Sequence, residues 1–89
     1  MTPEKAEILA LEALGWLAAE PERLQRFLNL SGLDVDALRE TAGTLTLHVA
    51  ILDFLMGHEP DLLRFCEEAG VAPADPARAR RALARDEAE

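Results

Sequence analysis

The sequence predicts an all-α protein, a compact bundle of five or six short helices around a central apolar helix at residues 44–57. Three observations predict this fold class. Residues 44–57 (TLTLHVAILDFLMG) are apolar on nearly every face of a helix, which is typical of a helix enclosed by others. The chain is 49% apolar but only 4% aromatic, and its core side chains are mostly leucine and alanine, which are strong helix formers. Proline and glycine residues divide the remainder into segments of helical length.

The central helix is expected to pack against its own chain and not in a membrane. Its apolar stretch is well short of the roughly 20 residues that span a bilayer, and Asp53 lies within it. Its least apolar side is a narrow ribbon of small or polar residues, which are Thr46, Ala50, Asp53 and Gly57. We therefore expect no membrane contact and a core built around this helix.

Length and charge limit the number of domains and the partners. Residues 1–89 are expected to form a single domain, because the chain can bury one hydrophobic core but not two. The 9 Lys and Arg residues against 17 Asp and Glu residues give a net charge of -8. This charge repels phosphate backbones at long range, so nucleic acid is not the partner that we expect.

The single cysteine and the N-terminal charges favour a cytoplasmic location. Cys66 cannot form an internal disulfide, and a lone thiol suits a reducing compartment. The apolar run at residues 8–19 is preceded by Glu4, Lys5 and Glu7 and interrupted by Glu12, so the charge before it is negative overall, which is the wrong sign for a secretory signal.

Capping signals place the helices along the chain. Thr2-Pro3 starts the first helix, Pro21 separates it from the second, Gly32 ends the second, and Asp34 caps a short third helix. The expected helices cover residues 3–19, 21–31, 35–42, 44–57, 59–69 and 76–85.

The amphipathic patterns predict which side chains are buried. In the second helix Leu24, Phe27 and Leu28 are expected inside and Arg23 outside; in the third, Val35 and Leu38 are expected inside. The last helix, with Leu83 as its only large apolar residue, is expected to be the least stable element.

Two segments resemble each other. Residues 20–33 (EPERLQRFLNLSGL) and 59–71 (EPDLLRFCEEAGV) share Glu-Pro, Arg-Phe and a glycine followed by an aliphatic residue. One interpretation is a duplication of a three-helix unit, with helices one to three repeated as four to six. The other is that two amphipathic helices with proline starts and glycine ends look alike.

Asp53 is the first residue to consider for a functional role, because it is a carboxylate within the most apolar helix. If it is buried it needs a partner, for which Arg39, Arg64 and Arg26 are the candidates. If it lies at an exposed margin its role is structural. No nucleophile, base or second carboxylate accompanies it at a helical spacing, so we expect no catalytic residue and no enzyme.

The sequence predicts no metal or cofactor site. His48 and His58 share neither a helical face nor a metal-ligand spacing, and Cys66 is far from both. His48 is expected to be packed or hydrogen-bonded, His58 to be a turn residue, and Cys66 to behave as a small hydrophobe.

Two features are considered for nucleic-acid binding. Arg78, Arg80, Arg81 and Arg85 form the only local positive cluster, which we interpret as a solvated face because acidic residues follow it. The second and third helices have the outline of a helix-turn-helix. The segment DVDALRE at residues 34–40, which is the third helix with its capping residue, however, carries three acidic residues and one arginine, which opposes contact with phosphates.

The chain resembles an uncharacterised family of short alphaproteobacterial all-helical proteins, a domain of unknown function. The resemblance covers residues 6–83. The matching positions are Trp16-Leu17, Phe27-Leu28, Gly32, Leu38-Arg39, the run Leu52-Asp53-Phe54-Leu55, Leu63, Phe65 and Gly70. It implies a small cytoplasmic all-α protein and supplies no activity, ligand or catalytic residue.

By elimination, we expect a non-enzymatic protein–protein interaction or adaptor module with an unidentified protein partner. The alternative is a nucleic-acid-associated regulator that uses helices two and three or the arginine cluster. Trp16 is the first interface anchor to consider if it is exposed, and a core residue if it is buried. The sequence leaves the oligomeric state open.

Overall fold

The computed structural model describes the backbone of residues 1–88 and the side chains of residues 1–84. Within these residues the chain forms six helices and no strand, which confirms the all-α prediction. The helices are α1 (Pro3–Ala18), α2 (Pro21–Ser31), α3 (Val35–Thr41), α4 (Leu45–Met56), α5 (Glu59–Ala69) and α6 (Asp75–Ala88). None of the described helices is long and apolar enough to cross a membrane.

Local signals define the helix ends much as the sequence indicates. The side chains of Thr2, Asp34 and Thr44 each accept a hydrogen bond from a backbone N–H in the first turn of the helix that follows. Gly32 and Gly70 end α2 and α5 with φ of 78° and 69°. Only glycine adopts this left-handed conformation at no steric cost, so these two residues determine where α2 and α5 stop.

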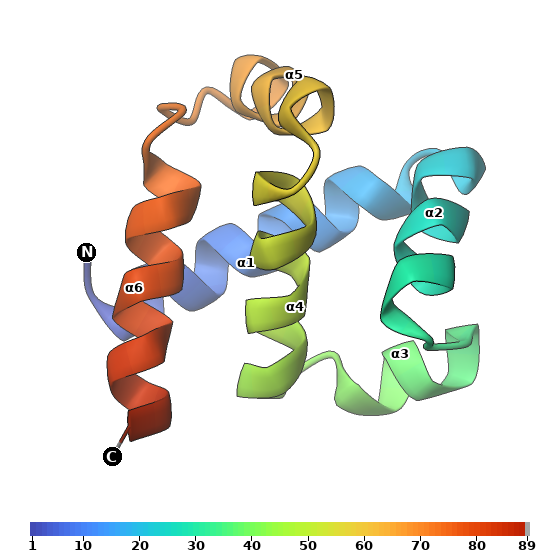
Figure 1. The fold of residues 1–89 in the computed structure, drawn as a ribbon, viewed down its shortest axis with the longest axis horizontal. Helices are drawn as coiled ribbons and strands as arrows, with labels where there is room; N and C mark the ends of the chain where they lie inside the picture. The colour runs from blue at the N-terminus through green and yellow to red at the C-terminus, as the bar shows by residue number, and fades with distance from the viewer. Residues whose placement is uncertain (89) are drawn as a thin grey trace.

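The central position of α4 is confirmed. It packs against all five other helices, and the α1, α4 and α6 pairs have the most extensive contacts. Figure 1 shows α4 between α6 and α2, with α1 crossing behind them. Ile51, Leu52 and Leu55 are completely buried, while the ribbon of Thr46, Asp53 and Gly57 is exposed. The hydrophobic core therefore forms around α4 on every side except this ribbon.

Helix α6 packs more extensively than its composition suggests. It lies against both α1 and α4, and Ala79, Ala82 and Leu83 are buried. Alanine side chains let helix backbones approach closely, so a helix with one large apolar residue still buries a continuous face. The expectation that α6 is the least stable element does not take account of this packing.

Two burial predictions are wrong. Val35, in the first turn of α3, is 45% exposed, whereas Leu38 in the next turn is buried where α3 packs on α4. Arg23 is buried instead of exposed, for a reason described below.

The repeated segments recur as local structure but not as packing. Both α2 and α5 begin next to a Glu-Pro pair and end at a left-handed glycine. The third helices of the two halves differ, since α6 packs along α4 and α1 whereas α3 packs on α4.

Replacing Gly15 with alanine is expected to stabilise the protein. Gly15 is exposed in the last turn of α1, and a Cβ atom added there has no neighbour within 4 Å. Because alanine has the higher helix propensity, we expect the free energy of unfolding to rise by about 0.5–1 kcal/mol and the melting temperature by a few degrees. Circular dichroism melts measure the change. Gly32→Ala is the control and is expected to destabilise, since Gly32 has positive φ; a lower melting temperature for Gly15→Ala would contradict the prediction.

Candidate functional site

An apolar groove lies between α2 and α4. It encloses about 410 Å³ and is open to solvent along one side. Its lining residues are Phe27, Leu30, Ser31, Ala50, Asp53, Phe54 and His58. Leu30 is 65% exposed at its edge, the highest value among the large hydrophobic side chains.

Three rings in contact form the floor of this groove. The rings of Phe27 and Phe54 meet edge to face with their centroids 5.5 Å apart. The imidazole of His58 stacks on Phe54 at 4.5 Å, with the ring planes 26° apart. Aromatic pairs in these geometries hold one another in place, so the floor is apolar and preformed.

A second hollow extends the groove along α4. It encloses about 170 Å³ and shares Ser31 and Ala50 with the first. The remaining lining residues are Leu33, Thr41, Thr44, Thr46 and Leu47, so the two hollows together follow α4 from its first turn to its last. The exposed ribbon that the sequence predicts on α4 is thus one side of a long groove, and α2 is the opposite wall.

The polar groups of the groove lie at the end of α4. His58 Nδ1 is 2.8 Å from the Phe54 carbonyl oxygen and donates a hydrogen bond to it, because a carbonyl can only accept. Asp53 Oδ1 accepts a hydrogen bond of 2.9 Å from Arg80 Nε on α6. These contacts fix the His58 ring against Phe54 and connect α4 with α6.

The exposure of Asp53 decides whether it is a buried carboxylate that needs a partner or an exposed residue with a structural role. Its side chain is 53% exposed, so the structural interpretation applies and no buried charge has to be compensated. Its partner is Arg80, which is 27 residues away; the three proposed partners Arg39, Arg64 and Arg26 are wrong. An ion pair with this exposure contributes at most about 1 kcal/mol to stability.

The family model described as "Protein of unknown function (DUF3572)" matches residues 3–86. The chain belongs to this family. Comparison with curated proteins and with solved structures gave no significant match. The DUF3572 assignment agrees with the resemblance to an uncharacterised family and carries no activity.

The two histidines of this DUF3572 chain have separate structural roles. His48 is buried, and its Nε2 donates a hydrogen bond of 3.0 Å to the Ala42 carbonyl oxygen just before α4. His58 lies at the other end of the same helix. Among the described residues, no three His, Cys, Asp or Glu side chains are grouped so that they could hold a metal ion.

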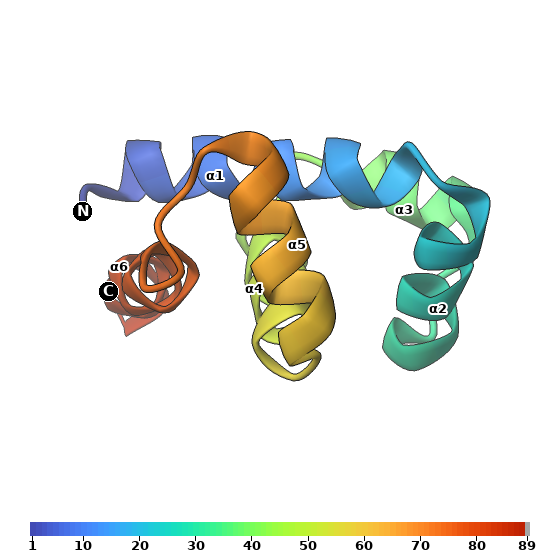
Figure 2. The ribbon, with the colours of Figure 1, turned by 90° about the horizontal axis from the view of Figure 1, so that it is seen from above.

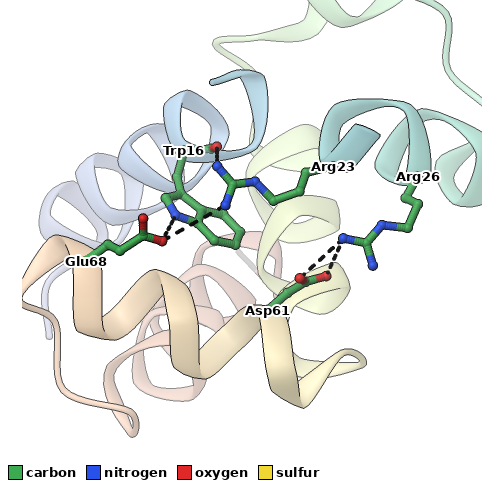
Figure 3. A network of polar contacts seen from close by, with 5 residues as sticks. All are labelled: Trp16, Arg23, Arg26, Asp61 and Glu68. Atoms are coloured by element: carbon green, nitrogen blue, oxygen red, sulfur yellow. Dashed lines mark hydrogen bonds and ion pairs between the residues drawn. The ribbon is translucent and has the colours of Figure 1, made fainter. Parts of the chain in front are cut away.

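A polar network that the sequence analysis missed joins α1, α2 and α5 (Figure 3). The guanidinium of Arg23 lies 3.7 Å from the ring centroid of Trp16 and donates a hydrogen bond of 2.9 Å to the Trp16 carbonyl oxygen. The Trp16 indole N–H donates to Glu68 at 2.7 Å. Trp16 also packs edge-on against Phe65, so both its ring and its N–H are engaged within the chain and it is not a free interface anchor.

The second part of this network pairs Arg26 with Asp61. Arg26 Nη2 donates a hydrogen bond of 3.3 Å to Asp61 Oδ1 and lies 3.2 Å from Oδ2, an ion-pair distance without hydrogen-bond geometry. Asp61 is buried, whereas the Arg26 side chain is half exposed. Each buried charge, Arg23 and Asp61, lies four residues before a core phenylalanine, Phe27 or Phe65. That spacing places them on the inner face of their helices and is the sequence signal for their burial.

The arginine cluster of α6 is partly engaged. Arg78 lies 3.6 Å from Asp75 in an ion pair one turn away, and Arg80 pairs with Asp53. The Arg85 side chain lies outside the described residues.

Cys66 is expected to react slowly in the folded protein. Burial raises the pKa of its thiol, and the negative charge of Asp75 adds to the effect. Less thiolate is therefore present at pH 8 than for an exposed cysteine. We expect Ellman's reagent to modify Cys66 at least about tenfold more slowly in the native protein than in urea. Equal rates in the two states would contradict this assignment.

Proposed function

We propose that this protein is a non-enzymatic interaction module of the cytoplasm that binds a segment of a partner protein in the groove between α2 and α4. The observation that carries the proposal is the open apolar groove whose floor is formed by the buried rings of Phe27 and Phe54 and the partly buried ring of His58. The exposed side chain of Leu30 lies at its edge. Preformed apolar grooves on helical domains are typical sites for peptide segments.

The shape of the groove supports a peptide over a compact small molecule. The hollows follow α4 from Thr44 to His58, a length of about 20 Å at the rise of an α-helix. This length matches an amphipathic helix of about four turns. Thr46 is exposed along the groove, and its hydroxyl group can form a hydrogen bond at the polar rim. The hydroxyl groups of Ser31 and Thr44 instead bond to backbone groups of their own chain.

The nucleic-acid alternative has less support. The third helix has seven residues, and its N-terminal cap is the carboxylate of Asp34, so negative charge lies at the end that would face phosphates. In α6 two of the arginines are paired with aspartates. We therefore retain the protein-interaction module as the function.

Affinity capture from the native cytoplasm with matched variants tests this proposal. Leu30→Asp places a charge at the edge of the groove without disturbing the core, because Leu30 is mostly exposed. Leu63→Asp is the control, since Leu63 is also an exposed leucine but lies on α5 outside the groove. We expect wild type and Leu63→Asp to retain the same partner protein at about 0.5 M salt. The amount that Leu30→Asp captures should be lower by at least about tenfold.

Two results would refute the groove as the binding site. One is equal capture by wild type and Leu30→Asp. The other is loss of capture to the same extent with Leu63→Asp, which would indicate nonspecific adhesion of exposed leucines. Capture of nucleic acid that disappears at moderate salt would favour the alternative function.

A further inference from the structure

The outer face of α1 carries an apolar seam that no other helix covers. Figure 2 shows α2, α4 and α6 on one side of α1. On the exposed face Ile8 is 57% and Leu11 is 40% accessible, followed by Gly15 and Ala18, which are also exposed. The opposite face of α1 is buried and consists of Ala6, Leu9, Ala10, Ala13 and Leu17. Helix α1 is therefore apolar on two faces, and only one is used within the chain.

The spacing of this seam is that of a helix-pairing surface. Ile8, Leu11, Gly15 and Ala18 are separated by three, four and three residues, which is the alternating spacing of the contact positions in coiled coils. Gly15 adds a second indication. Nothing in the chain approaches the position of its missing Cβ, so the fold itself has no need for a glycine there. A glycine on an exposed helix lets another backbone come close.

We propose that α1 pairs with α1 of a second copy of this chain in an antiparallel homodimer. With Ile8 opposite Leu11 of the second copy, the same register places Glu4 opposite Gly15. Each of these contacts occurs twice because the arrangement is two-fold symmetric. The aliphatic part of Glu4 then covers the glycine, so a larger residue faces a smaller one and the seam is complementary to itself.

The charges beside the seam fit this register. Lys5 is the only lysine of the chain, and Lys5 and Glu12 flank Ile8 and Leu11 on the same side. In the part of the chain that the structure describes, neither side chain has an ion-pair partner. Antiparallel pairing brings Lys5 of each copy next to Glu12 of the other, since positions 5 and 12 are equivalent positions of the heptad pattern. A parallel arrangement would not place these two residues together.

The dimer is expected to be weak. One pair of four-turn helices buries less area than a standard stable interface, and both copies carry a net charge of -8. Association should therefore occur with a Kd in the micromolar to millimolar range.

Sedimentation equilibrium on the full chain, at concentrations from about 10 μM to 1 mM, tests the pairing. We expect wild type to pass from monomer to dimer in this range and Leu11→Glu to weaken association at least tenfold. Leu63→Glu is the control, because Leu63 is similarly exposed on another helix, and it should dimerise like wild type. Circular dichroism establishes that both variants fold.

Charge reversal tests the antiparallel register. Lys5→Glu places two glutamates together in the homodimer, and Glu12→Lys places two lysines together, so each variant alone should associate less than wild type. An equimolar mixture of the two restores both ion pairs and should associate more tightly than either variant alone. Wild type that stays monomeric at 1 mM, or a mixture that associates no better than its components, would overturn the proposal.

Discussion

Replacing Leu52 with alanine is expected to lower the free energy of unfolding by about 3–5 kcal/mol. Leu52 is completely buried in α4, where α1, α5, α6 and α2 also pack. Removing its side chain loses hydrophobic burial and leaves a cavity that surrounding helices cannot close completely. Since small domains are stable by only about 5–15 kcal/mol, this single change should remove a large share of the total.

Urea titration followed by circular dichroism measures this loss. Leu63→Ala is the matched control, because it removes the same atoms from a leucine that is 46% exposed. We expect the control to cost less than about 1 kcal/mol. Similar costs for both variants would show that α4 is not the centre of the core.

Replacing Arg23 with alanine is expected to cost about 2–4 kcal/mol, a large effect for an arginine. The change removes the buried stacking of the guanidinium on Trp16 and leaves the Trp16 carbonyl at the end of α1 without its hydrogen bond. It also removes the positive charge near Glu68, whose carboxylate lies 4.0 Å away. Helices α1, α2 and α5 would lose a shared contact.

Thermal and urea unfolding of three variants measures this contribution. Arg23→Lys should recover only part of the loss, because an ammonium group lacks the planar geometry that stacks on an indole. Arg64→Ala is the control; Arg64 is exposed on α5 and should change stability by less than about 0.5 kcal/mol. A result for Arg23→Ala within the range of the control would contradict the structural role of the network.

The sequence predicts those features of this fold that depend on neighbouring residues. Thr2, Asp34, Gly32 and Gly70 act within one turn of their own helices, and their positions alone indicate where those helices begin or end. The enclosure of α4 is also predictable, because its apolar side chains surround the helix axis.

Contacts between distant segments are not predictable in the same way. The Asp53–Arg80 and Trp16–Glu68 contacts join residues 27 and 52 positions apart, and nothing in either local pattern selects the partner. Arg23 is assigned to the surface because arginine is usually exposed, although its spacing from Phe27 places it on the inner side of α2. A charged residue four positions before a core phenylalanine is therefore a sequence signal that the charged residue is buried.

The candidate groove is predictable only in part. The ribbon of Thr46, Ala50 and Asp53 marks the side of α4 that no helix covers. That α2 stands opposite this ribbon, with Phe27 reaching Phe54, depends on how the chain turns at Gly32 and Gly43. The groove is therefore a property of the tertiary arrangement.

Photo-crosslinking in the native cell tests the central functional claim most directly. A benzoylphenylalanine placed at position 30 lies at the groove edge, and one at position 63 has comparable solvent access on α5. The groove account predicts a discrete covalent adduct with another protein from position 30 and none from position 63. Adducts from position 63 with none from position 30 would contradict it.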